Sequence, residues 1–239
     1  MKRLGVIGGL GPIATAYFFE LVIKMTDANC DQEHLEILIY NCPSIPDRTS
    51  YILHKSEDSP IDKMVEIGKK LTREGVDYIG IPCITAHYFY EELQYRIGAP
   101  IIHMVKETVS YLRVHNVKTV GIMATDGTVQ SKLFQSALEA EGMQVVVPKD
   151  KDQTYVMDLI YRNVKANRPV EMEKFYVVAT QLRKAGAEVI ILGCTELSLI
   201  KRDYTIGPGF IDTMEVLAMH AITRCGMPLK KEYRNLISM

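Results

Sequence analysis

The sequence predicts an α/β protein whose sheets are built from parallel strands. Short apolar runs of strand length alternate with stretches of helical periodicity along nearly all of the 239 residues. The runs are rich in valine and isoleucine and mostly lack polar alternation, which is typical of strands covered on both faces. Alternating strands and helices favour βαβ units and hence parallel sheets.

The expected strands come from these apolar runs, and one helix between them has clear end signals. In Ser59-Pro60-Ile61-Asp62, a serine N-cap, a proline at the first helical position and an acid in the first turn predict a helix start. Lys70 to Gly75, basic and then glycine, predicts its end. The strands are expected at 3–8, 35–41, 76–82, 100–103, 118–124, 143–147, 187–193 and 209–212.

The order of elements is repeated, which predicts a duplicated α/β domain with a cleft between the copies. A strand, a small-residue turn and a helix begin each half, at GVIGGLGPIATAYFFELV and at TVGIMATDGTVQSKLFQSAL. Each half later carries a strand that ends on a cysteine, Cys83 or Cys194. Ligands bind beyond the carboxyl ends of parallel strands, so both thiols are expected at the cleft.

Composition and charge give no sign of a nucleic-acid or membrane partner. The formal net charge is −1 and there is no basic run, so we expect no nucleic-acid partner and no membrane partner. The apolar run at the N-terminus breaks at glycines, too short for a signal peptide or a membrane span. A cytoplasmic location is expected.

The five cysteines predict free thiols and no metal site. Their number is odd and no CxxC pair exists, so zinc and iron–sulfur spacings are missing. In a reducing cytoplasm each cysteine is a small buried hydrophobe or a reagent. We expect the first role for Cys30 and Cys225, and the second for Cys83 and Cys194.

A thiol between a strand end and a helix N-terminus meets unpaired N–H groups and the positive end of the helix dipole. Both effects predict pKa values below the usual value of about 8.5 for Cys83 and Cys194. Thr85 and Thr195 add hydroxyls at the same turns. Two such thiols indicate acid–base chemistry near neutral pH, with one base and one acid.

Two other motifs have weaker functional readings. Gly9-Leu10-Gly11-Pro12-Ile13-Ala14 fits a dinucleotide fingerprint, but the next strand ends in Asn41 where an acid is expected, and Pro12 lacks an N–H donor. A tight strand-to-helix turn is the favoured interpretation. His87 follows Cys83 by four residues and could activate it as a nucleophile, but a packed histidine is favoured.

Three further segments could bind a carboxylate. Arg48, in a proline-bracketed loop, could clamp a carboxylate, or simply pair with Asp47. Lys165 ends a predicted helix, where a cation is favourable in any case. The turn from Thr125 to Thr128 could form an anion-binding nest, or only an N-cap.

Together these motifs resemble the aspartate/glutamate racemase family, whose members are cofactor-independent enzymes of cytoplasmic amino-acid metabolism. GGLGPIAT, PDRTS, IPCITAH, ATDGT, NVKAN and GCTEL occur in family order and span nearly the whole chain. GCTE is closer to the aspartate racemase branch than the GCTH usual in glutamate racemases.

The resemblance implies a fold of two pseudo-symmetric Rossmann-like (flavodoxin-like) domains and a homodimer. We expect residues 1–105 with 213–239 in one domain, carrying Cys83, and residues 106–212 in the other, carrying Cys194. The resemblance also assigns substrate binding to Arg48, Lys165, Thr125 and Thr128, and places the turn at Gly9 and Leu10 on the cleft. With Thr85 and Thr195 these residues form the expected site, with an amino-acid substrate and no cofactor.

One position departs from the family, which usually has asparagine after its first cysteine. Here it is Ile84, which can neither donate nor accept a hydrogen bond. The expected function is racemisation of aspartate, glutamate or a broader set of amino acids by two cysteines. Alternatives are a non-catalytic amino-acid-binding relative, another two-cysteine isomerase or hydantoin racemase, a nucleotide-dependent oxidoreductase and a cysteine hydrolase.

Overall fold

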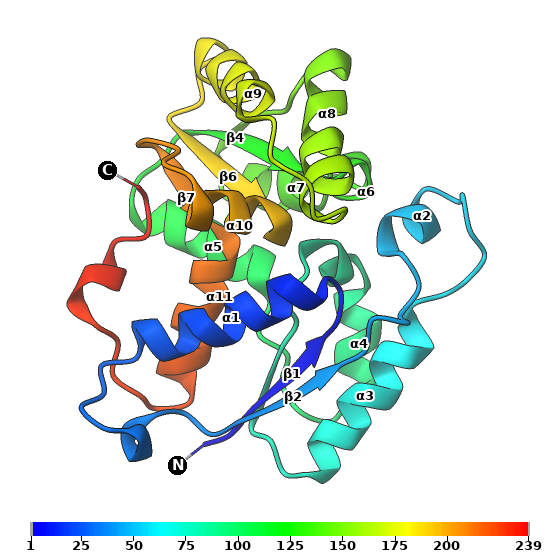
Figure 1. The fold of residues 1–239 in the computed structure, drawn as a ribbon, viewed down its shortest axis with the longest axis vertical. Helices are drawn as coiled ribbons and strands as arrows, with labels where there is room; N and C mark the ends of the chain where they lie inside the picture. Colours follow the sequence, from blue (N-terminus) through cyan, green and yellow to red (C-terminus); the bar gives the residue numbers. More distant parts are fainter. Residues whose placement is uncertain (1, 239) are drawn as a thin grey trace.

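The computed structural model describes residues 2–238, which form two parallel sheets with helices around them (Figure 1). The first sheet has the order β2-β1-β3 and the second the order β5-β4-β6-β7. The strands are β1 (Leu4–Gly8), β2 (Ile37–Asn41), β3 (Tyr78–Gly80), β4 (Thr119–Ala124), β5 (Gln144–Val146), β6 (Val189–Gly193) and β7 (Phe210–Asp212). All five strand pairings are parallel, as the apolar runs predict.

Helices join successive strands in both halves. In the first half they are α1 (Pro12–Met25), α2 (Arg48–Ile52), α3 (Ile61–Arg73), α4 (Tyr90–Arg96) and the short 3₁₀ segments η1 (Asp31–Glu33) and η2 (Ile84–Phe89). Between the halves and in the second are α5 (Met104–Val114), α6 (Asp126–Gln130), α7 (Leu133–Ala140), α8 (Asp150–Met157), the π-helix η3 (Asp158–Val164), α9 (Met172–Lys184) and α10 (Thr195–Asp203). The chain ends with α11 (Thr213–Arg224) and the 3₁₀ segment η4 (Lys231–Arg234).

The prediction of a strand over 100–103 is wrong in extent. Only Ile101 pairs with β3, in a single parallel bridge to Ile79. The backbone then turns to start α5 at Met104, with the His103 side chain accepting a hydrogen bond from the Lys106 N–H (3.4 Å). The segment therefore covers the edge of β3 without becoming a full strand.

The ends of α3 follow the sequence signals with a shift of one residue. Pro60 is the N-cap and Ile61 the first helical residue. Ser59 still contributes, because its Oγ accepts a hydrogen bond from the Ile61 N–H (3.3 Å). Gly75 ends the helix at a φ of 78°, which costs glycine little.

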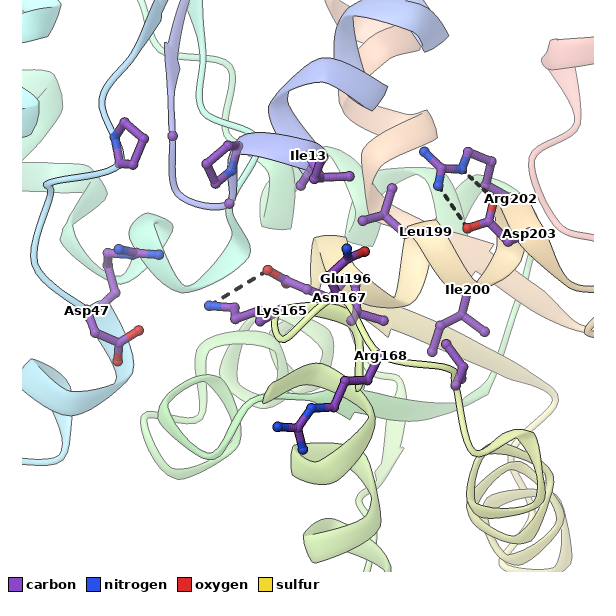
Figure 2. A pocket seen from close by; sticks show the side chains of 18 of the residues that line it. Ile13, Asp47, Lys165, Asn167, Arg168, Glu196, Leu199, Ile200, Arg202 and Asp203 are labelled. Carbon is purple, nitrogen blue, oxygen red and sulfur yellow. Dashed lines mark hydrogen bonds and ion pairs between the residues drawn. The ribbon is translucent and has the colours of Figure 1, made fainter. Parts of the chain in front are cut away.

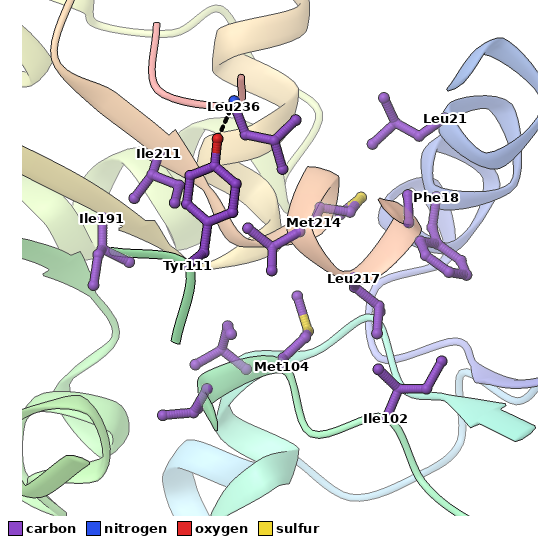
Figure 3. Packing of buried hydrophobic residues seen from close by; sticks show 14 of the residues in the cluster. Phe18, Leu21, Ile102, Met104, Tyr111, Ile191, Ile211, Met214, Leu217 and Leu236 are labelled. Carbon is purple, nitrogen blue, oxygen red and sulfur yellow. Dashed lines mark hydrogen bonds between the residues drawn. The ribbon is translucent and has the colours of Figure 1, made fainter. Parts of the chain in front are cut away.

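One hydrophobic cluster joins the two sheets through α11. It contains Val6 of β1 and Ile191 of β6 together with Met214 and Leu217 of α11. Figure 3 shows Phe18 and Leu21 of α1 facing the α11 side chains, with Ile191 and Ile211 on the other side. The helix after β7 thus packs on both halves and fixes how the strand ends face each other. The exact division into two domains stays a prediction.

Within residues 2–238, the structure has no helix both long enough and apolar enough to cross a membrane.

Candidate active site

Both sequence-predicted thiols line one small chamber at the carboxyl ends of the strands. Cys83 lies between β3 and η2, and Cys194 lies between β6 and α10. Both are buried. The chamber has a volume of about 10 Å³, roughly enough for one water molecule. Its wall is formed by Leu10, Asp47, Arg48, Thr49, Cys83, Ile84, Thr85, Thr125, Tyr161, Lys165, Cys194, Thr195 and Glu196.

Most of the expected site residues therefore come together. Of the ten, only Thr128 and Gly9 are not in the chamber wall. Thr128 bonds to two wall residues, and Gly9 lines a larger cavity next to the chamber. Four further residues of the wall, Asp47, Thr49, Tyr161 and Glu196, were not expected from the sequence.

Arg48 is the cation on the Cys83 side. It begins α2 and is buried, so it is not a surface loop residue. Its Nη atoms donate to the carbonyls of Leu10 (3.1 Å) and Pro46 (2.9 Å). Burial opposes the charge of Arg48, but the Cys83 sulfur and Asp47 outweigh this and raise its pKa. The buried Nε has no partner among the described residues, so one N–H of this cation remains free for a ligand.

Glu196 is the anion on the Cys194 side. The Cys194 Sγ donates to Glu196 Oε2 at 2.8 Å, and Lys165 Nζ lies 3.7 Å from Glu196 Oε1. Burial and the neighbouring carboxylate raise the pKa of Cys194 well above its usual value, despite Lys165. The prediction of a lowered pKa is therefore wrong for Cys194, because desolvation and Glu196 outweigh the helix N-terminus. The carboxylate two residues after the cysteine is visible in the sequence GCTE. Its contact with Cys194, however, depends on the conformation of the turn between them.

Three threonine hydroxyls form a buried cluster that joins the two halves. Thr85 Oγ1 lies 3.2 Å from both Thr125 Oγ1 and Thr128 Oγ1, and these two are also 3.2 Å apart. Thr125 caps α6 by accepting from the Thr128 N–H (3.3 Å). Thr85 comes from the Cys83 turn and the other two from the turn after β4, so the cluster draws together segments 40 residues apart.

Lys165 follows the π-helix η3, which confirms its expected place at a helix end. Its Nζ lies 4.6 Å from the centre of the Tyr161 ring. Tyr161 in turn donates to Asp47 Oδ2 (3.4 Å), which connects the second half to the segment that carries Arg48. Tyr161 precedes Lys165 by four residues, a spacing that brings two side chains together on one face of a helix. This spacing was the signal available in the sequence.

His87 is packed away from Cys83. Its Nε2 lies 3.2 Å from the Ile81 carbonyl, and its ring stacks on His103 at 5.3 Å. Burial lowers the pKa of His87 to about 4. Among the described residues, no hydrogen bond joins His87 to Cys83, so the favoured interpretation of a packed histidine holds.

The glycine turn is shaped by packing. Gly9 has a φ of 90°, and a Cβ there would come within 2.4 Å of the Cys42 backbone. Its N–H donates to Thr15 Oγ1 (2.9 Å) and is not free for a phosphate. Pro12 opens α1, as the favoured reading of this motif expects. The turn delivers the Leu10 carbonyl to Arg48.

The other cysteines lie outside the chamber wall. Cys225 is buried, as expected. The expectation for Cys30 is wrong, because this residue is exposed at the start of η1.

A wider vestibule of about 940 Å³ adjoins the chamber. The two cavities share Asp47, Arg48, Lys165 and Glu196 in their walls. Figure 2 shows Lys165 and Glu196 facing each other at this boundary, with Ile13 and Leu199 on the vestibule side. The ion pair between Lys165 and Glu196 therefore lies between a small inner chamber and a space large enough for a small molecule.

Two thiols from corresponding strand ends line one small chamber, with cations at its boundary. Comparison with known proteins identifies the family to which such a chain belongs. Residues 7–221 match the model of the Asp/Glu/hydantoin racemase family. The chain therefore belongs to this family, and it is an enzyme of the amino-acid racemase type.

Individual relatives agree with this assignment. The chain is 30% identical over 230 residues to the broad specificity amino-acid racemase RacX of Bacillus subtilis, covering 92% of this chain and 96% of that one. The solved structure of the Picrophilus torridus aspartate racemase is similar, with a TM-score of 0.87, 36% identity and 98% of each chain covered. The glutamate racemase of Francisella tularensis shares the fold at a TM-score of 0.66 and 18% identity, covering 93% of this chain and 80% of that one.

Proposed function

We propose that this racemase inverts the α-carbon of an amino acid by two proton transfers, with Cys83 and Cys194 on opposite faces of the substrate. The supporting observation is that the two thiols line the same chamber from corresponding strand ends in the two halves. One thiolate removes the α-proton, and the thiol on the other side donates a proton to the opposite face. The roles exchange for the other enantiomer.

The two thiols have opposite electrostatic surroundings, which suggests their resting states. Cys83 lies near the Arg48 cation, whereas Cys194 donates a hydrogen bond to the Glu196 carboxylate. A cation favours the thiolate and a carboxylate favours the thiol. We infer that Cys194, which donates to Glu196, first acts as the acid, so that removal of the α-proton falls to Cys83.

The substrate proposed is an α-amino acid with an acidic side chain, and related amino acids as a broader set. Its two carboxylates would be bound by Arg48 and Lys165 and by the hydroxyls of the threonine cluster. The same groups would stabilise negative charge that develops when the α-proton leaves. The similarity to an aspartate racemase and to a broad specificity racemase supports this range.

The chain residues in the chamber supply acid, base and charge stabilisation, so we propose a reaction without cofactor or metal. Within residues 2–238, no group of three or more metal-binding side chains gathers. We also propose a cytoplasmic location, which suits catalytic thiols that must stay reduced.

The test is proton NMR of the α-hydrogen in deuterated water, across a panel of L- and D-amino acids and a hydantoin. Wild-type enzyme should exchange the α-proton and form the other enantiomer. Cys83→Ser and Cys194→Ser should each abolish racemisation, and one-sided exchange without inversion in one of them would support two separate bases. Cys225→Ser, at a buried thiol outside the chamber wall, is the control and should remain active.

Full racemisation by both chamber variants would refute the two-thiol mechanism. Binding of amino acids by the wild type without any α-exchange would instead support the non-catalytic relative. Exchange confined to the hydantoin would identify a hydantoin racemase.

A further inference from the structure

Tyr161 lies in the wall of the chamber, but the proposed proton transfers give it no role. It belongs to the π-helix η3, which continues directly from α8. The wide turn is visible in the hydrogen bond from the Lys165 N–H to the Ile160 carbonyl (2.9 Å), which joins residues five apart. Short π-helical segments are rare and frequently occur at functional sites, so the residues that this segment carries are candidates for a functional role.

The Tyr161 ring contacts the Lys165 ammonium. Lys165 Nζ lies 4.6 Å from the centre of the ring, within the range of a cation–π interaction. Glu196 Oε1 lies 3.7 Å from the same nitrogen, and Figure 2 shows the two side chains facing each other. A lysine side chain is long and flexible, so its rotamer freedom opposes any single position. The ring from η3 and the carboxylate from α10 together hold the ammonium in place.

The Tyr161 hydroxyl anchors the ring to the first half of the chain. It donates to Asp47 Oδ2 (3.4 Å), and Asp47 Oδ1 accepts from the Ser50 N–H (2.8 Å) as the N-cap of α2. Burial raises the pKa of Tyr161 to about 12, so the hydroxyl keeps its proton near neutral pH and can donate. Because Asp47 directly precedes Arg48, this tyrosine connects the segments that carry the two proposed carboxylate-binding cations.

Tyr161 also lies between the chamber and a second cavity. An open groove of about 410 Å³ adjoins this residue. The groove and the chamber share Asp47, Thr49 and Tyr161 in their walls. A smaller side chain at position 161 would leave space beside Lys165, and the flexible lysine could then move away from the chamber.

We propose that Tyr161 is a positioning residue for racemisation, because its ring keeps the Lys165 ammonium at the chamber wall, where a substrate carboxylate would meet it. This role rests on the proposed function, in which Lys165 binds a carboxylate. Tyr161 acts through the place of Lys165 and not by contact with the reacting atoms. The ring makes the main contribution, and the hydroxyl contributes by anchoring the ring on Asp47.

The first test measures KM and kcat of Tyr161→Leu and Tyr161→Phe for the preferred substrate of the amino-acid panel. Tyr161→Leu removes the ring and should raise KM about tenfold. The kcat should change by no more than about threefold, because the lost contact supports binding before as well as during the reaction. Tyr161→Phe keeps the ring and should raise KM by no more than about threefold, the effect of one weak hydrogen bond.

The matched control is Tyr155→Leu on α8. Tyr155 is also half-buried and has a lysine near its ring, with Lys174 Nζ 5.7 Å from the ring centre, but it lines neither the chamber nor the groove. This variant should leave KM and kcat unchanged. Circular dichroism verifies that each variant is folded.

A double-mutant cycle tests whether Tyr161 acts through Lys165. In a Lys165→Ala background, Tyr161→Leu should no longer raise KM. An increase as large as in the wild-type background would overturn the proposal, because the ring would then act by another route. An increase of about tenfold in Tyr161→Phe, which retains the ring, would overturn it as well.

The second test needs no turnover. Competitive acetylation with trace acetic anhydride, read by mass spectrometry, measures how readily each lysine amine reacts. Lys165 should react about tenfold faster in Tyr161→Leu than in the wild type, and at nearly the wild-type rate in Tyr161→Phe. Lys174 is the internal control, because its side chain is also ion-paired and is 22% exposed where that of Lys165 is 27% exposed.

The rate for Lys174 should be the same in all three proteins. An unchanged Lys165 rate in Tyr161→Leu would overturn the positioning role, whatever the kinetics show. A wild type that racemises no amino acid would refute the proposed function instead, and the acetylation rates would still decide whether Tyr161 positions Lys165.

Discussion

At the scale of single residues, the carboxylate of Glu196 accepts a hydrogen bond from Cys194 Sγ at 2.8 Å. Because this carboxylate and burial raise the pKa of Cys194, Glu196→Gln should lower that pKa while keeping a hydrogen-bonding side chain. Cys194 should then be alkylated by iodoacetamide at lower pH than in the wild type, as measured by mass spectrometry of its peptide. The kcat should fall by about 10- to 100-fold, since a hydrogen bond to a charged group is lost.

The matched control for this change is Asp203→Asn, at the far end of the same helix. Asp203 pairs with Arg202 and does not line the chamber. An unchanged alkylation profile in Glu196→Gln would show that Glu196 does not control the Cys194 proton.

Ile84 is a residue-scale test of substrate preference. It lines the chamber but is also packed in the main hydrophobic cluster. Ile84→Asn should raise kcat/KM for aspartate relative to apolar amino acids, since a new hydrogen bond to a charged group contributes about 1.5–3 kcal/mol. Ile84→Val is the control for packing, and it should lower stability slightly without changing the preference. An unaltered preference in Ile84→Asn would mean that Ile84 only packs.

At this site the sequence predicts where the two thiols lie but not the pKa of Cys194. The positions of Cys83 and Cys194 follow from strand ends, because an apolar run marks where a strand stops. The pKa of Cys194 does not follow, because it depends on where the Glu196 side chain turns. Asp47 and Tyr161 come from opposite halves of the chain, so no local pattern could indicate their contact.

At the scale of elements, the turn between β1 and α1 can be tested by two glycine substitutions. Gly9 and Gly226 have similar backbone angles, with φ values of 90° and 84°. A Cβ at Gly9 would meet the Cys42 backbone at 2.4 Å, whereas nothing lies within 4 Å of one at Gly226. Gly226→Ala should lower the free energy of unfolding by about 1–2 kcal/mol, the cost of the backbone angle alone.

Gly9→Ala should cost at least about 2 kcal/mol more, because it adds overpacking against a backbone that cannot move aside. Urea unfolding of both variants measures the difference. Equal losses would show that the turn is set by backbone angle and not by the close approach of the two loops.

The elements differ in how well the sequence predicts them. Helix α3 has a proline start and a glycine stop, and it lies within one residue of the expected position. The run at 100–103 is as apolar as a strand, but a strand needs a neighbour along its whole length. Only Ile101 finds one, and this depends on where the preceding helix α4 ends.

At the scale of the whole molecule, a buried carboxyl pair makes stability depend on pH. Burial and the nearby Asp212 raise the pKa of Glu215 to about 7 despite an ion pair with Lys201. The folded protein thus holds this proton more tightly than the unfolded chain, where the pKa is about 4.5. The resulting stability is fully present below about pH 4.5 and is lost as the pH rises through about 7.

Glu215→Gln removes this titration. The free energy of unfolding of the variant minus that of the wild type should rise between pH 5 and pH 7, by up to about 1.4 kcal/mol per pH unit, and then level off. Urea unfolding at several pH values measures it, with the exposed Glu232→Gln as the control. A difference that stays flat from pH 5 to pH 8 would contradict the expected proton uptake.

The duplicated parallel-sheet architecture was predictable, because the alternation of strands and helices and its repetition lie in the sequence itself. The hydrophobic core that the two sheets share was not predictable from the sequence. Helix α11 packs on α1 and also joins the β6 and β7 side chains, a contact between segments nearly 200 residues apart. The way in which the ends of β3 and β6 face each other depends on that packing.

The chain passes between its two sheets three times. It crosses at α5, again from β7 into α11, and a third time when the segment after Leu229 returns to pair Ile237 with β7. Each thiol belongs to a different sheet, but the three crossings of the chain tether the two sheets together. The effective concentration of one thiol near the other is therefore set by these tethers. Because these tethers hold the two thiols near each other, bringing both of them onto one substrate loses little translational freedom.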